Sequence, residues 1–186
     1  RYYSFLTWCV SDYLGRVKGT ALDGGLRMAL LLRERALTLG CAFDHEGQPC
    51  EGGGLIGSRE AAHVVAANAG DALRLDRVEL SKNLAWDAYK GSLAGLDLFV
   101  GAAPEADGSE DEDTDEPPDT EQLTEDDLLL SPAGAELARL FGMAVSGASV
   151  ASAVTRSRPE VTPAELDEWG KAAGLCALAA GRAPEL

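Results

Sequence analysis

Two cysteines and a histidine in one short stretch are the first candidates for chemistry. A loop through Cys41, His45 and Cys50 could bring two thiolates and an imidazole to a zinc ion, with Cys9 or His63 as a fourth ligand. The closely spaced Cys-x-x-Cys pair that makes such an assignment strong is absent. We therefore expect buried, reduced thiols and a surface histidine, with no metal and no other cofactor.

A glycine-rich run, residues 52–57, satisfies the pattern G-x-G-x-x-G and precedes a predicted helix. A dinucleotide site also needs a preceding strand and a βαβ unit, and residues 41–51, with His, Asp, Gln and Pro among them, do not favour a strand. The signatures of serine hydrolases, P-loop proteins and zinc proteases are absent. His63 is more typical of a partly buried helix residue than of a base. We expect no catalytic residue and a protein that is not an enzyme.

Acidic residues are concentrated in one part of the chain. The formal net charge is −15, and 13 of the 31 acids fall in residues 104–127. No Lys or Arg occurs from residue 91 to residue 138, and the rest of the chain carries 18 acids against 16 bases. This distribution predicts a nearly neutral folded body that carries a disordered acidic insertion at 104–127.

The elements that must position any site are mostly helices. Residues 2–17 have apolar side chains on most sides and predict a buried helix. A second helix is expected to begin after Thr20, where a capping-box pattern stands, and to continue to Phe43. Its predicted core stripe is Ala29, Leu32, Ala36, Leu39 and Phe43.

The charged run Arg33-Glu34-Arg35 falls inside this second helix. Charged side chains strongly prefer water. We therefore expect the run to lie mostly toward solvent, while Trp8, Trp86 and Trp169 belong to the core.

The middle of the chain has the element order of a winged helix-turn-helix domain. Ser58 can cap a helix that ends near Asn68. Further elements are predicted in this order: a helix over 81–94, a strand over 96–100, a strand over 128–130 and a helix over 131–144 that starts at Ser131-Pro132. Residues 93–99 and 128–138 resemble the two wing strands and closing helix of many winged-helix repressors.

This resemblance defines the expected domain organisation. The fold class is mainly α, with a helical domain over 1–145 that has a winged-helix-like core at about 55–145 and a short two-stranded hairpin. The acidic insertion interrupts that core. Residues 146–186 are expected to form a C-terminal linker and a helical extension, in which Thr162 to Glu165 is a capping box. The predicted face of this last helix is Leu166, Trp169, Ala173, Cys176 and Ala180.

The winged-helix resemblance implies nucleic acid as an alternative partner. The residues that would contact it are Arg74, Arg77, Lys82, Asn83 and Lys90. Phosphate binding depends on such cations, and the 13 acids would sit at the wing tip, where they repel a duplex. The charge distribution therefore disfavours nucleic acid, although a long insert could move beyond the Debye length of about 8 Å.

A broader resemblance covers most of residues 1–145. The opening Arg1-Tyr2-Tyr3-Ser4-Phe5, followed by residues 55–61 and 83–89, is similar to a group of uncharacterised prokaryotic proteins with an Arg-Tyr-Tyr-Ser-Phe start. The resemblance implies the extent of a domain and no activity. The acidic insertion departs from that group.

These observations predict a non-catalytic interaction module of a larger cytoplasmic protein. Its partner would be a basic protein, another part of the same longer chain, or a nucleic-acid machine. The longest charge-free stretch of the C-terminal half, residues 140–155, is shorter than the roughly 20 residues that a membrane-spanning helix needs. The alternative is a DNA-binding transcriptional regulator or an accessory domain of a nucleic-acid-processing enzyme. The oligomeric state stays open.

Overall fold

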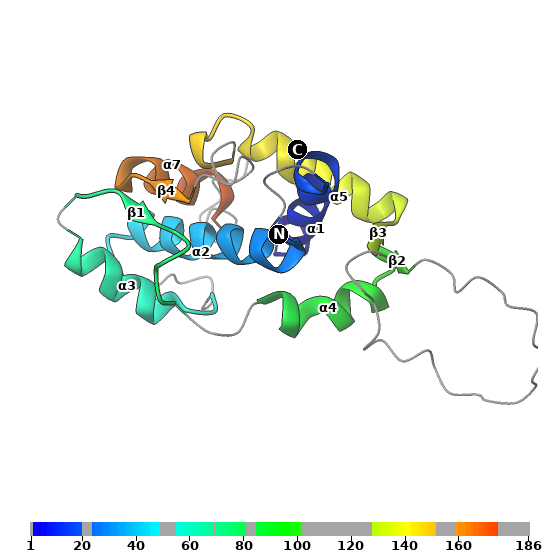
Figure 1. Ribbon diagram of the computed structural model, residues 1–186, viewed down its shortest axis with the longest axis horizontal. Coiled ribbons are helices and arrows are strands. Elements are labelled where there is room, and N and C mark those ends of the chain that lie inside the picture. The colour runs from blue at the N-terminus through cyan, green and yellow to red at the C-terminus, as the bar shows by residue number, and fades with distance from the viewer. Residues whose placement is uncertain are drawn as a thin grey trace, which may run out of the picture.

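Helix α2 (Leu26–Asp44) runs through the middle of the fold (Figure 1). The computed structural model describes residues 2–19, 24–48, 55–68, 70–80, 85–101, 128–151 and 159–174. Within these ranges the protein is mainly α, as predicted. No helix of the described ranges is long and apolar enough to cross a membrane.

The remaining helices lie beside α2 or at one end of the body. They are α1 (Tyr2–Asp12), the π-helical turn η1 (Tyr13–Val17), α3 (Ser58–Ala67), α4 (Ala85–Gly95), α5 (Pro132–Val145) and α7 (Pro163–Ala173). Helix α7 lies along one side of α2, and α3 and α4 follow one another along the other side (Figure 1). Helices α1 and α5 pack against each other at one end of the body.

Two small antiparallel sheets join segments that are distant in sequence. Strand β1 (Leu73–Arg74) pairs with β4 (Glu160–Val161), and β2 (Phe99–Gly101) pairs with β3 (Leu128–Leu130). The predicted pairing of residues 128–130 with the preceding strand is confirmed. The first strand starts at residue 99 and not at 96, because Leu96 and Asp97 form a turn in which Asp97 has φ 51°.

The core begins with α1, which is buried on most sides as predicted. Phe5, Leu6, Cys9 and Val10 are fully buried. An aromatic cluster then joins three helices: the ring centroid of Trp8 lies 5.5 Å from that of Phe141 and 5.8 Å from that of Trp169. Aromatic pairs at these distances add to the stabilisation from burial alone.

Helices α2 and α7 approach each other closely because both carry glycine at the crossing point. A Cβ on Gly170 would overlap the carbonyl oxygen of Gly40, and a Cβ on Gly40 would lie 2.9 Å from the amide nitrogen of Gly170. Beside this crossing Trp169 is fully buried. The C-terminal helix, expected as an extension, is therefore part of the main core. The last predicted face residues, Cys176 and Ala180, lie outside the described residues.

Local helix starts follow the sequence in two cases. The capping box is confirmed: the Thr162 hydroxyl accepts a hydrogen bond from the Glu165 amide, and the Glu165 carboxylate accepts one from the Thr162 amide, at 2.7 Å. Ser131 likewise accepts from the Gly134 amide at 3.0 Å, with Pro132 in the first turn.

Two other helix starts differ from prediction. Helix α2 starts at Leu26 after Gly25, whose φ of 86° does not belong to a helix, and the predicted capping box at 20–23 lies outside the described residues. Helix α3 starts at Ser58, but its N-cap is Gly57 and the Ser58 side chain does not cap it.

The prediction that Arg33, Glu34 and Arg35 lie mostly toward solvent is wrong. Arg33 is 1% exposed and Glu34 is 8% exposed. The guanidinium of Arg33 forms an ion pair with Asp12 at the end of α1, and it donates a hydrogen bond to the carbonyl of Ala29 at 2.9 Å. The two charges can be buried because each neutralises the other.

The winged-helix arrangement is not confirmed, although the predicted element order is present. Helix α3 packs against the C-terminal half of α2, where Thr38 donates a hydrogen bond to the carbonyl of Ile56. The first residue of α4, Ala85, donates its backbone amide to Glu34 in the N-terminal half of α2. Helices α3 and α4 thus both pack against α2, at successive positions along it.

Replacing Gly170 with alanine should destabilise the fold by about 1–3 kcal/mol, because the added Cβ must push α7 away from α2. Urea unfolding measures this change. Gly91→Ala in α4 is the matched control, since nothing lies within 4 Å of a Cβ there and alanine favours a helix by up to about 1 kcal/mol. Equal unfolding midpoints for Gly170→Ala and the wild type would contradict the close packing.

Arg33→Met should cost about 3–5 kcal/mol, because it leaves the Asp12 carboxylate buried without its main partner. The double variant Arg33→Met/Asp12→Leu should recover much of that loss, since both buried charges are then removed. The comparison of the three unfolding free energies tests the pair. A single variant as stable as the wild type would show that the ion pair does not hold α1 to α2.

Candidate interaction site

The hairpin formed by β2 and β3 has apolar side chains on both faces. Phe99 and Leu128 point inward and are buried, at 6% and 3% exposure. Val100 and Leu129 are opposite each other in the register and are 46% and 54% exposed. We call these two side chains the hairpin patch. An outward-facing strand position is normally polar, so this exposed cross-strand pair of apolar residues makes the outer face of the hairpin a candidate binding surface.

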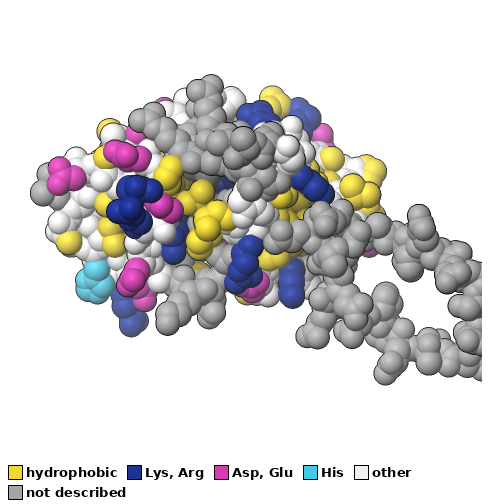
Figure 2. Space-filling view, in the orientation of Figure 1, with side chains coloured by type: hydrophobic (Ala, Val, Ile, Leu, Met, Phe, Trp, Pro, Cys, Tyr) yellow, Lys and Arg dark blue, Asp and Glu magenta, His cyan; other side chains and the backbone are white. Residues whose placement is uncertain are grey.

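Further apolar surface lies close to the hairpin patch. Leu96, in the turn that precedes β2, is 55% exposed. Figure 2 also shows hydrophobic side chains at the end of the body where α5 begins, next to the hairpin in Figure 1. Of the five large apolar side chains that are exposed among the described residues, Leu96, Val100 and Leu129 thus lie on or next to the hairpin, while Met28 and Met143 lie elsewhere on α2 and α5.

The inner face of the hairpin is fixed to α4 and α5. The Phe99 ring packs edge-on against Trp86 of α4, with centroids 5.6 Å apart. At the start of α5 the Ser131 amide donates a hydrogen bond to the carbonyl of Leu98 at 3.1 Å, and a Cβ on Gly134 would overlap that same carbonyl oxygen. Glycine at position 134 thus allows α5 to contact the hairpin backbone directly.

Helix α4 is in turn held by a carboxylate of α2. Glu34 accepts hydrogen bonds from the backbone amides of Ala85 and Trp86, at 2.7 and 3.0 Å. It therefore caps the N-terminus of α4 from another helix, where a negative charge is favoured. Burial raises the pKa of Glu34, while the two amide hydrogen bonds act in the opposite direction. An exposed ion pair between Arg27 and Asp87, at 3.2 Å, joins the same two helices.

The acidic residues join the two strands of the hairpin in sequence. Strand β2 ends at residue 101 and β3 begins at residue 128, so residues 104–127 lie between them. The predicted disordered insertion itself lies outside the described residues. The segment that carries the 13 carboxylates is nonetheless part of the chain that runs from the end of β2 to the start of β3.

The residues predicted to contact nucleic acid do not form one described surface. Arg74 lies on β1 and pairs with Asp76 at 2.8 Å, and this hydrogen bond lowers the pKa of Asp76. Arg77 is exposed in the turn after β1, and Lys90 is exposed on α4. Lys82 and Asn83 lie outside the described residues.

The candidate zinc ligands are also not brought together in the described residues. Cys9 and Cys41 are buried, on α1 and α2, and Cys50 lies outside the described residues. His45 is half-buried at the end of α2, with its imidazole 3.9 Å from Asp44. Within the described ranges no three His, Cys, Asp or Glu side chains could hold a metal ion. Burial raises the pKa of the Cys9 thiol, which disfavours the reactive thiolate.

His63 is exposed on α3, so the prediction that it is partly buried is wrong. Helix α3 buries Ala61 against the core, and its other side chains are half-buried or exposed. Within the described ranges, His63 belongs to no cluster of His, Cys, Asp or Glu side chains that could hold a metal ion.

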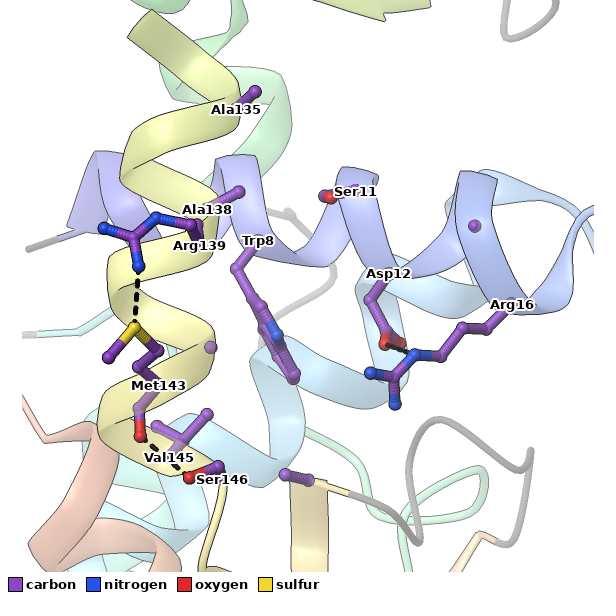
Figure 3. A pocket seen from close by; sticks show the side chains of 13 residues that line it. Trp8, Ser11, Asp12, Arg16, Ala135, Ala138, Arg139, Met143, Val145 and Ser146 are labelled. Atoms are coloured by element: carbon purple, nitrogen blue, oxygen red, sulfur yellow. Dashed lines mark hydrogen bonds and ion pairs between the residues drawn. The ribbon is translucent and has the colours of Figure 1, made fainter. Parts of the chain in front are cut away.

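A pocket between α1 and α5 was missed by sequence reasoning (Figure 3). Trp8, Asp12 and Arg16 line it from α1 and η1, and Arg139 and Met143 line it from α5. The sequence does contain a signal for the buried ion pair in the pocket wall. An aspartate in a helix that is predicted to be buried on most sides needs a partner of opposite charge. That partner, Arg33, comes from the charged run that was expected to face solvent.

The raised pKa of Glu34 has a measurable consequence for stability. Because the folded protein holds the proton more tightly than the unfolded chain does, the contribution of Glu34 is greatest below its ordinary pKa of 4.5 and decreases as the pH rises through the raised pKa. Glu34→Gln removes this contribution. The unfolding free energy of wild type relative to Glu34→Gln should therefore decrease as the pH rises from the ordinary pKa of 4.5 through the raised pKa. The exposed Glu79→Gln is the control, and a difference independent of pH would contradict the expectation.

Comparison of the chain with protein-family models, with curated proteins and with solved structures gave no match. The function proposed below therefore rests on the contacts, burial and charge of this chain's own residues.

Proposed function

We propose that the protein is a non-catalytic interaction module that binds a basic protein segment through the hairpin patch and the acidic residues linked to it. The observation that carries the proposal is the exposed cross-strand pair Val100 and Leu129. Burying two such side chains on binding contributes about 25 cal/mol for each Å² of apolar surface removed from water.

The charge of the linked segment defines the chemistry of the partner. Residues 104–127 carry 13 acids, and no Lys or Arg occurs from residue 91 to residue 138. A partner with Lys or Arg next to apolar residues satisfies both features, since its cations meet the carboxylates while its apolar side chains cover the hairpin patch. Charges of opposite sign also accelerate the encounter at low ionic strength.

The way the hairpin is anchored supports a role in recognition. Trp86, Gly134 and Ser131 fix the inner face, and Glu34 holds the helix that leads into β2. A surface that is already ordered loses less conformational entropy on binding than a flexible one does. The buried thiols Cys9 and Cys41 support a cytoplasmic location, where thiols remain reduced.

A DNA-binding regulator with a winged-helix-like centre is the alternative proposal. The element order α3, α4, β2, β3 and α5 supports it. The pairing of Arg74 with Asp76 and the acidic sequence between the two wing strands weaken it.

Binding of a synthetic peptide of about ten residues that alternates Lys and Leu tests the proposal, with a Glu and Leu peptide as the charge control. The wild type should bind only the basic peptide, and less tightly as salt rises. Val100→Ser/Leu129→Ser should weaken binding about tenfold, because it removes the apolar contact. Replacing the 13 acids by their amides should remove the salt dependence. Isothermal titration calorimetry measures each affinity.

Met28→Ser is the matched control, because Met28 is 44% exposed on α2 and lies outside the hairpin patch. It should bind the basic peptide as the wild type does. Equal binding by the Val100→Ser/Leu129→Ser variant would refute the hairpin patch as the site. A gel shift with a short DNA duplex, abolished by Lys90→Ala, would favour the alternative.

A further inference from the structure

The pocket between α1 and α5 exists because small side chains face each other across it. Gly15 lines one wall, and Ala135, Ala138 and Gly142 line the other. Trp8 lies between these walls (Figure 3), and a Cβ on Gly142 would come within 3.2 Å of its ring. The pocket is open to solvent on one side, and its volume of about 640 Å³ falls in the range of small-molecule sites, which often lie between packed helices.

The charges around the pocket do not cancel. The Asp12 carboxylate, whose side chain is 3% exposed, is matched by the buried guanidinium of Arg33. Arg139 is matched by Glu136, to which it donates two hydrogen bonds of 2.7 Å. Arg16 approaches Asp12 through Nε at 3.4 Å, and its side chain is 69% exposed. Among the described residues, the single Asp12 carboxylate thus faces two guanidiniums, those of Arg33 and Arg16, which leaves one positive charge in excess there.

The position of Arg16 depends on the π-helical turn that follows α1. Residues 13–17 form η1, and both Gly15 and Arg16 of this turn line the pocket. Single π-helical turns occur frequently at functional sites, because the wider turn changes the direction of the side chains it carries. In Figure 3 Arg16 and Asp12 extend from this helix on the same side as Trp8.

We propose that this pocket binds a planar aromatic anion, with the ring against Trp8 and the small residues, and with its carboxylate or phosphate at Arg16. The guanidinium offers planar N–H donors that suit either group. Asp12 is the one carboxylate among the described lining residues, and the buried guanidinium of Arg33 pairs with it. The site is separate from the hairpin patch and does not depend on the function proposed there.

Gly15 provides a direct test of the pocket. A Cβ at this position has no described atom within 4 Å, so a side chain can be introduced there without a clash at its first atom. Gly15→Leu fills the space, whereas Gly15→Ala leaves most of it open. Arg16→Gln removes the positive charge at an exposed position and is a second, independent variant.

The probes are 2-naphthoate, 2-naphthyl phosphate, the neutral 2-naphthamide and the cation 2-naphthylmethylammonium, each titrated into the full chain by calorimetry. We expect one or both anions to bind about tenfold or more tightly than the amide, and the better anion identifies the acidic group. Gly15→Leu should abolish binding and Gly15→Ala should retain it. Arg16→Gln should bring the affinity of the anion down to that of the amide.

Val100→Ser/Leu129→Ser should leave the affinity of the anions unchanged, which separates this pocket from the hairpin patch. Circular dichroism and thermal unfolding establish whether each variant is folded. If Gly15→Leu does not fold, the affinities measured with Arg16→Gln test the proposal. Equal binding of amide and anion, tighter binding of the cation, binding unaffected by either variant, or no binding of any probe would each overturn the proposal.

Discussion

The three consecutive charged residues of α2 each hold a different segment against that helix. Arg33 pairs with Asp12 of α1, Glu34 caps α4, and Arg35 donates a hydrogen bond of 2.7 Å to the carbonyl of Leu75 after β1. Successive residues of a helix point about 100° apart, so three neighbours can reach three directions. Buried charges must find partners, and a wrong arrangement of α1, α4 or the segment after β1 would leave one unpaired. These pairs therefore select one packing of the elements around α2.

The candidate interaction site depends on this arrangement. Glu34 fixes the start of α4, and Trp86, one residue further, packs against Phe99 of the hairpin. The hairpin is thus connected to α2 through a short series of rigid contacts. Because the inner face is fully used by these contacts, Val100 and Leu129 are left on the outside with no described element to cover them.

Close packing by glycine has opposite effects in two parts of the fold. Gly40 and Gly170 let α2 and α7 touch, and this contact encloses Trp169. Between α1 and α5 the small residues stand beside a large one, Trp8, and a pocket remains at Gly15. Where a second backbone lies opposite a glycine, the missing side chain lets two helices come into contact. Where no described atom lies opposite, as at Gly15, the missing side chain leaves open space.

The sequence by itself determined the features whose partners lie within a few residues. The helix starts at Ser131 and Thr162 use hydrogen bonds to positions three residues away. The pairing of the hairpin joins more distant residues, and it was predicted from the nearly alternating residues 96–100 and the apolar run 128–130. Only the tertiary structure decided the burial of Arg33 and Glu34, whose partners are 21 and 51 residues away. Helical periodicity predicts which face is apolar, but it cannot show that a charged side chain has a distant partner of opposite charge. For the same reason the pocket beside Trp8 and the outward position of Val100 and Leu129 became apparent only once the elements were packed.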